Sequence, residues 1–123
     1  NLKSSTLANL LINNKILTLD LMKIDIVGHE FVSIKPFKEL LFLHKPDIII
    51  EVLSSSSSKE LHDFFLSGGY LCFLINEKKQ SLQLIKECPI DLKTDDSRNW
   101  FVTCKTKDYL KTIFKDKIII NGL

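Results

Sequence analysis

The chain has 123 residues, of which 45% are hydrophobic and 26% charged, and its formal net charge is +2 at pH 7. A chain of this length and composition is long enough to fold as one globular domain around a hydrophobic core. The near-neutral charge gives no reason to expect nucleic acid as a partner, and no apolar run reaches the roughly 18 to 20 residues that span a bilayer. We therefore expect a cytoplasmic protein that binds neither nucleic acid nor membrane.

The three cysteines, Cys72, Cys88 and Cys104, each lie in or beside an apolar segment. Paired ligands of a cysteine zinc site are usually about two to four residues apart, and no two of these cysteines are that close in sequence. Buried free thiols in a reducing compartment fit the pattern better. We therefore assign no metal-ligating residues, and we predict that these cysteines hold no zinc.

Hydrophobic periodicity and the positions of proline, glycine and serine predict alternating helices and strands. The expected elements, in chain order, are a short helix in residues 4–13, a strand over 19–27, a helix over 30–44 that Pro36 interrupts, a strand over 47–53, a helix over 59–66, strands over 70–75, 81–86 and 99–104, and a closing helix over 108–115. Loops are expected over 54–58 and 87–98. Residues 118–120 are too few to assign.

The first two strands predict the fold class. They are separated by about twenty residues that contain one helix, which is the spacing of a right-handed crossover between parallel neighbours. Both strands are nearly continuous apolar runs, as expected where helices cover both faces of a parallel sheet. The predicted fold is therefore α/β, with a mostly parallel sheet and flanking helices.

Polar residues end these two strands, and an open α/β sheet has its ligand crevice at the carboxyl ends of its strands. Neighbouring strands lie about 5 Å apart, so Asp25 and Glu51 are expected to face one cleft, with Lys23 on the same face as Asp25. Such a group can bind a metal or a substrate hydroxyl, or act as a base. The alternative is an ion pair at the strand ends that stabilises nearby backbone donors.

The turn after the first strand supplies two further candidates. His29 and Glu30 follow Gly28 at the start of the next predicted helix. We assign both as candidate substrate-binding residues. Alternatively, the Glu30 carboxylate only interacts favourably with the helix dipole.

The order of these motifs resembles the FkbM-type S-adenosylmethionine-dependent methyltransferases. In that family a Thr-Leu-Asp run precedes a strand that ends in Lys-x-Asp-x-Glu-Gly-x-Glu. A proline then precedes an apolar strand that ends in Glu, and Gly-Tyr follows later. The matching residues are Thr6, Leu7, Lys23, Asp25, Gly28, Glu30, Pro46, Glu51, Gly69 and Tyr70, and the segment Asn99, Trp100, Phe101 resembles the family's final strand.

The resemblance implies a Rossmann-like methyltransferase fold of which residues 1–123 are the distal half, without the amino-terminal glycine-rich half that holds S-adenosylmethionine. It also implies methyl transfer from S-adenosylmethionine to an oxygen of a small-molecule or glycan acceptor, often a sugar or natural-product hydroxyl. Asp25 is then the acceptor-side group, with Glu51 as its neighbour and Lys23 as charge support. On this interpretation the chain alone is an incomplete enzyme.

Two other functions stay open. Val27 stands where the family has the Glu that precedes glycine. That difference favours a non-catalytic methyltransferase-like module that binds a partner through the same surface. The third interpretation is a glycan- or nucleotide-binding α/β domain of different ancestry.

Overall fold

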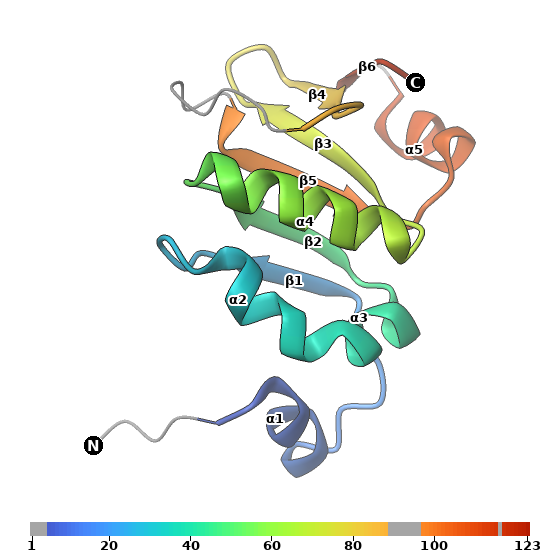
Figure 1. Cartoon of the computed structure of the whole chain (residues 1–123). Helices are drawn as coiled ribbons and strands as arrows, with labels where there is room; N and C mark the ends of the chain where they lie inside the picture. The colour runs from blue at the N-terminus through green and yellow to red at the C-terminus, as the bar shows by residue number, and fades with distance from the viewer. Residues whose placement is uncertain (1–4, 89–96, 116) are drawn as a thin grey trace.

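The computed structural model describes residues 5–88, 97–115 and 117–123. Within these ranges, six strands form one sheet in the order β1-β2-β5-β3-β4-β6 (Figure 1). The elements are α1 (Leu7–Asn13), β1 (Leu21–Ile24), α2 (Glu30–Ile34), the 3-10 helix η1 (Lys35–Phe37), α3 (Lys38–His44), β2 (Asp47–Glu51), α4 (Ser55–Ser67), β3 (Leu71–Asn76), β4 (Ser81–Leu84), β5 (Asn99–Thr103), α5 (Lys107–Phe114) and β6 (Ile119–Asn121).

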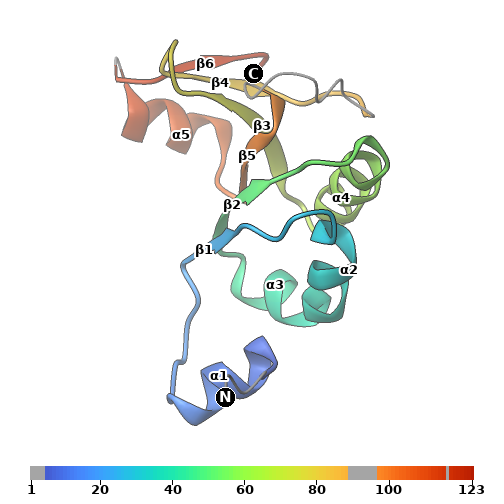
Figure 2. The ribbon, with the colours of Figure 1, turned by 90° about the vertical axis from the view of Figure 1, so that its left-hand side faces the viewer.

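Helices cover the two faces of the sheet unequally. Helices α2, α3 and α4 lie on one face, and α5 lies on the other, on the side of the sheet that holds β3, β4 and β6 (Figure 2). The larger core cluster packs under the three helices and contains the fully buried Trp100 and Phe65. A smaller cluster, with Phe73, Leu82 and Leu110, lies under α5. In the described part of the chain, the α5 side of β1 and β2 has no helix over it (Figure 2).

The sheet is mixed. The pairs β1–β2 and β4–β6 are parallel, but β5 runs antiparallel to both β2 and β3, and β3 runs antiparallel to β4. The α/β class is therefore confirmed, whereas the expectation of a mostly parallel sheet is wrong. A short turn joins β3 to β4, and only antiparallel strands can be joined so closely.

Strand β1 is shorter and more exposed than its sequence predicts. The strand expected over 19–27 forms only over Leu21–Ile24, and it lies at the edge of the sheet. Leu21 is 61% exposed and Val27 is 72% exposed. The prediction that helices cover both faces of this strand is wrong, because the helices that pack here cover only one face.

Two predictions of where helices begin and end can be compared with the structure, and one of them is confirmed. The helix expected over 30–44 is interrupted as predicted, since α2 and α3 are separated by the 3-10 helix that contains Pro36. The loop expected over 54–58 is wrong: Ser54 caps α4 by accepting the N–H of Ser57, and the serines after it form the first turns of that helix. Serine oxygens suit this position because they satisfy free N–H groups there. Of the loop expected over 87–98, residues 89–96 lie outside the described residues.

Candidate functional site

The carboxyl ends of β1 and β2 lie side by side, as the sequence predicts. The two strands pair in parallel register, with Lys23 opposite Ile49 and Ile24 opposite Ile50. Ile24 and Ile50 belong to the core under α2–α4. Because side chains alternate along a strand, Lys23 and Glu51 lie on the opposite face, which no described helix covers at this point. Asp25 follows β1 directly.

Lys23 and Asp25 are neighbours on this face. The Lys23 Nζ lies 3.9 Å from Asp25 Oδ2, and the two side chains are 73% and 56% exposed. An exposed pair of this kind is worth at most about 1 kcal/mol, so both groups stay free to bind something else. The structure brings the two strand ends together, and among the described residues no hydrogen bond joins Asp25 to Glu51.

A groove of about 500 Å³ lies beside these residues, between α1, β1 and the α2–η1 segment. Its wall is mainly apolar, and Lys23 and Asp25 supply the charged groups. A mainly apolar pocket with a few polar groups is the usual form of a small-molecule site. The lining residues are Leu7, Met22, Lys23, Ile24, Asp25, Ile26, Ser33, Ile34 and Phe37.

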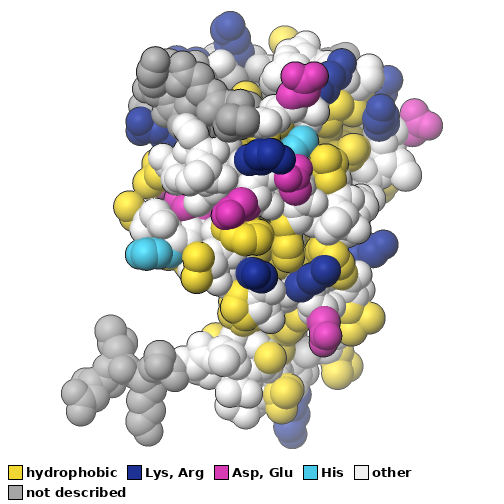
Figure 3. All heavy atoms as spheres, in the orientation of Figure 1, with side chains coloured by type: hydrophobic (Ala, Val, Ile, Leu, Met, Phe, Trp, Pro, Cys, Tyr) yellow, Lys and Arg dark blue, Asp and Glu magenta, His cyan; other side chains and the backbone are white. Residues whose placement is uncertain are grey.

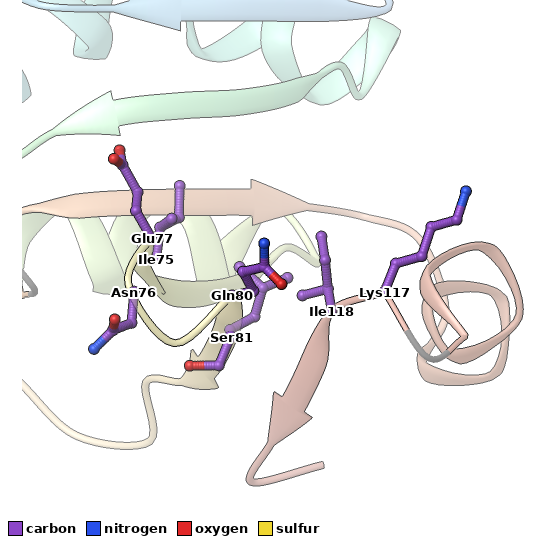
Figure 4. A pocket seen from close by; sticks show the side chains of 8 residues that line it. Ile75, Asn76, Glu77, Gln80, Ser81, Lys117 and Ile118 are labelled. Atoms are coloured by element: carbon purple, nitrogen blue, oxygen red, sulfur yellow. The ribbon is translucent and has the colours of Figure 1, made fainter.

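A second cavity, of about 340 Å³, lies at the opposite edge of the sheet (Figure 4). Glu77 and Gln80 line it from the turn between β3 and β4, and Lys117 lines it from the segment before β6. None of the predicted site residues borders this cavity. It is therefore separate from the groove beside Asp25.

Glu30 is buried, so its side chain is not accessible to a substrate. It is the first residue of α2 and is 0% exposed. Its Oε1 accepts two hydrogen bonds, from the N–H of Gly28 at 3.2 Å and from the N–H of Leu53 at 3.1 Å. Its Oε2 is buried without a partner in the described structure. No local pattern in the sequence indicates the bond to Leu53, since the two residues are far apart along the chain.

His29 and Val27 lie on the outside of the same turn. His29 is the N-cap residue of α2, but its ring makes no capping hydrogen bond and is exposed. Val27 is exposed as well. Of the two candidate substrate-binding residues, His29 is thus open to solvent and Glu30 is not.

Charged side chains of both signs are interspersed on the face covered by α2–α4 (Figure 3). Lys59 and Asp63 form an ion pair there at 2.7 Å. The hydrogen bond between them raises the pKa of Lys59 and lowers the pKa of Asp63. In residues 5–88, 97–115 and 117–123 no helix has the length and apolar character to cross a membrane.

The three cysteines are free thiols. Cys72 is buried, and burial raises the pKa of its thiol strongly. Burial also raises the pKa of Cys88 and of Cys104, which are half-buried. The described residues contain no group of three or more His, Cys, Asp or Glu side chains that could hold a metal ion.

Comparisons of the chain with protein-family models, with curated proteins and with solved structures gave no match.

Proposed function

We propose that this chain forms the acceptor-side part of an S-adenosylmethionine-dependent methyltransferase of the FkbM type. One observation carries the proposal: Asp25, which directly follows β1, and Glu51, which ends the adjacent parallel strand β2, match the family's motifs, and Asp25 borders a groove large enough for a small molecule. On this proposal, residues 1–123 are the distal half of a Rossmann-like domain. The acceptor is a small molecule or a glycan.

The residues present do not by themselves fit the cofactor. S-adenosylmethionine, when bound, supplies an electrophilic methyl group. Rossmann-like folds hold their cofactor at a glycine-rich turn between a strand and a helix. The four glycines of this chain, Gly28, Gly68, Gly69 and Gly122, form no Gly-x-Gly run. We therefore assign the chain no step through the cofactor.

The role proposed for these residues is on the acceptor side. Asp25 has an exposed carboxylate, which can accept a hydrogen bond, and then the proton, from an acceptor hydroxyl in the groove. Lys23, at 3.9 Å from Asp25, places a positive charge beside this carboxylate. Glu51 ends the neighbouring strand and does not line the groove, so its proposed role is to accept hydrogen bonds from substrate hydroxyls outside the groove. Orienting the acceptor and removing its proton are the contributions that such a site makes to a transfer reaction.

The exposed Val27 favours a second candidate, a methyltransferase-like module that binds without turnover. The family's Glu at this position would add a carboxylate beside Asp25, and an exposed valine cannot accept a proton or a hydroxyl bond. In such a module the same groove binds its ligand and no methyl group is transferred.

The experiment is calorimetric titration with S-adenosylhomocysteine, followed by a methyl-transfer assay with sugar acceptors, on the protein expressed from its complete gene. We expect binding and turnover. We also expect Asp25→Asn to lower kcat by about 100-fold or more, the usual effect of losing a general base. The matched control is Asp20→Asn, at an exposed aspartate just before β1, and it should leave kcat unchanged.

Three outcomes separate the candidates. Wild-type turnover in a stable Asp25→Asn protein would contradict the role of Asp25. Binding of S-adenosylhomocysteine without turnover would favour the non-catalytic module, and Val27→Glu is then the variant to test for gained activity. Absence of binding would overturn the methyltransferase proposal and leave the domain of different ancestry, which binds a glycan or a nucleotide.

A further inference from the structure

The Glu30 carboxylate connects two loops that are distant in sequence. Gly28 lies in the loop that follows β1, and Leu53 lies in the loop that follows β2, directly before the N-cap of α4. The N–H groups of both residues donate to the same oxygen, Oε1 of Glu30. These two loops begin where Asp25 and Glu51 stand, at the carboxyl ends of the parallel strands.

We propose that Glu30 is a positioning residue, whose single oxygen holds the β1–α2 loop against the β2–α4 loop and so fixes the spacing of Asp25 and Glu51. This clamp, the pair of hydrogen bonds that Glu30 accepts from Gly28 and Leu53, is a property of the fold. Its consequence for turnover rests on the proposed function. Because Glu30 is fully buried, it acts on the site through these backbone contacts.

The backbone at Gly28 is shaped for this contact. Its φ is +75°, a left-handed conformation that side chains with a Cβ rarely adopt. A Cβ built on Gly28 would meet nothing within 4 Å, so backbone conformation is the reason for glycine here, and not lack of space. That conformation turns the N–H of Gly28 toward the side chain two residues later. Gly28 and Glu30 therefore form one local unit, to which Leu53 is added from β2.

The cost of burying Glu30 also points to a specific role. A buried acceptor without a partner is unfavourable, by about 1 to 3 kcal/mol in mutational data, and Oε2 of Glu30 is such an acceptor. An apolar side chain of similar size would fill the same space without that cost. Two charge-assisted hydrogen bonds to otherwise separate loops offset it. A carboxylate at this position thus contributes the connection between the loops.

The test is NMR on the complete chain. In the unmodified protein the amides of Gly28 and Leu53 should both be protected from hydrogen exchange, because one carboxylate oxygen accepts both bonds. Glu30→Gln keeps an acceptor oxygen, so it should keep both amides protected. Glu30→Leu removes the acceptor, and exchange at both amides should become about tenfold faster or more. The amide of Ser33, which donates to the backbone oxygen of His29 at 2.9 Å, is the reference that should not change.

The controls keep the outcome decisive. His29→Gln changes the neighbouring exposed residue, whose ring makes no capping hydrogen bond, and it should leave both amides protected. Undiminished protection of both amides in Glu30→Leu, or loss of protection at only one of them, would overturn the proposal. If Glu30→Leu does not fold, the unmodified protein still decides, because fast exchange at either amide would contradict the two bonds. A failure to bind S-adenosylhomocysteine would refute the proposed function and leave these NMR results valid.

Discussion

Replacing Gly68 by alanine tests the packing of α3 against the end of α4. Gly68 is the C-cap of α4 with φ −91°, which any residue adopts. A Cβ built on it would lie 2.4 Å from Cε1 of the Phe42 ring and 2.7 Å from its Cδ1 and Cζ atoms. Carbon atoms pack favourably at about 3.5 to 4.0 Å. The ring must therefore retreat by about 1 Å, and glycine is needed here for space alone.

The surroundings of the Phe42 ring set the cost. Its centroid lies 5.3 Å from that of Phe64 and 6.4 Å from that of Tyr70, so a displaced ring disturbs two further contacts. Overpacking of this kind costs about 1 to 3 kcal/mol. Alanine also lowers the conformational entropy of the unfolded chain, which stabilises the folded state by about 0.4 to 1 kcal/mol. We expect Gly68→Ala to lower the free energy of unfolding by about 1 to 2 kcal/mol.

Urea unfolding measures this loss, and a double-mutant cycle identifies its cause. In a Phe42→Ala background the ring is gone, so the cost of Gly68→Ala should fall by at least half. Gly69→Ala is the matched control: its φ is +80° and its Cβ would meet nothing within 4 Å, so its cost, about 1 to 2 kcal/mol, should not depend on Phe42. An equal cost of Gly68→Ala in both backgrounds would refute the steric argument.

Two further predictions concern buried polar groups. Tyr70→Phe removes a hydroxyl that donates to the backbone oxygen of Leu41 at 2.9 Å. The Leu41 oxygen still accepts the N–H of Lys45 in this variant, so the free energy of unfolding in urea should fall by only about 1 kcal/mol. Tyr109→Phe, at an exposed ring, should change it by almost nothing. Equal stabilities of the two variants would contradict a stabilising role for the Tyr70 hydroxyl. Burial raises the pKa of Cys72, so under reducing conditions its contribution to stability is full below about pH 8.5, where the unfolded thiol is protonated, and declines as the pH rises further. In Cys72→Ala the free energy of unfolding should therefore fall less steeply between pH 7.5 and 9.5 than in the unmodified protein. An unchanged slope would contradict this prediction.

The sequence predicts well those parts of the fold that depend on local signals. The break at Pro36 follows from the backbone preferences of proline, and it is found. The parallel pairing of β1 and β2 follows from the length of the crossover between them. It is this pairing that brings Asp25 and Glu51 to neighbouring strand ends.

What the sequence does not predict depends on contacts between distant segments. The pairing partners of β5 are set by packing across the sheet, and its own residues carry no signal for them. The apolar run of β1 suggests cover on both faces, yet the arrangement of the helices leaves Leu21 exposed. The clamp at Glu30 has the same origin, since its second donor, Leu53, belongs to another loop.

The insertion of β5 between β2 and β3 also determines the order in which the sheet can be completed. Both neighbours are synthesised before residues 99–103, so each must stay without its final partner until β5 has been made. Contacts that span such long stretches of sequence slow folding. Trp100, the chain's single tryptophan, lies in this central strand and is fully buried. Its fluorescence therefore reports the step that closes the sheet.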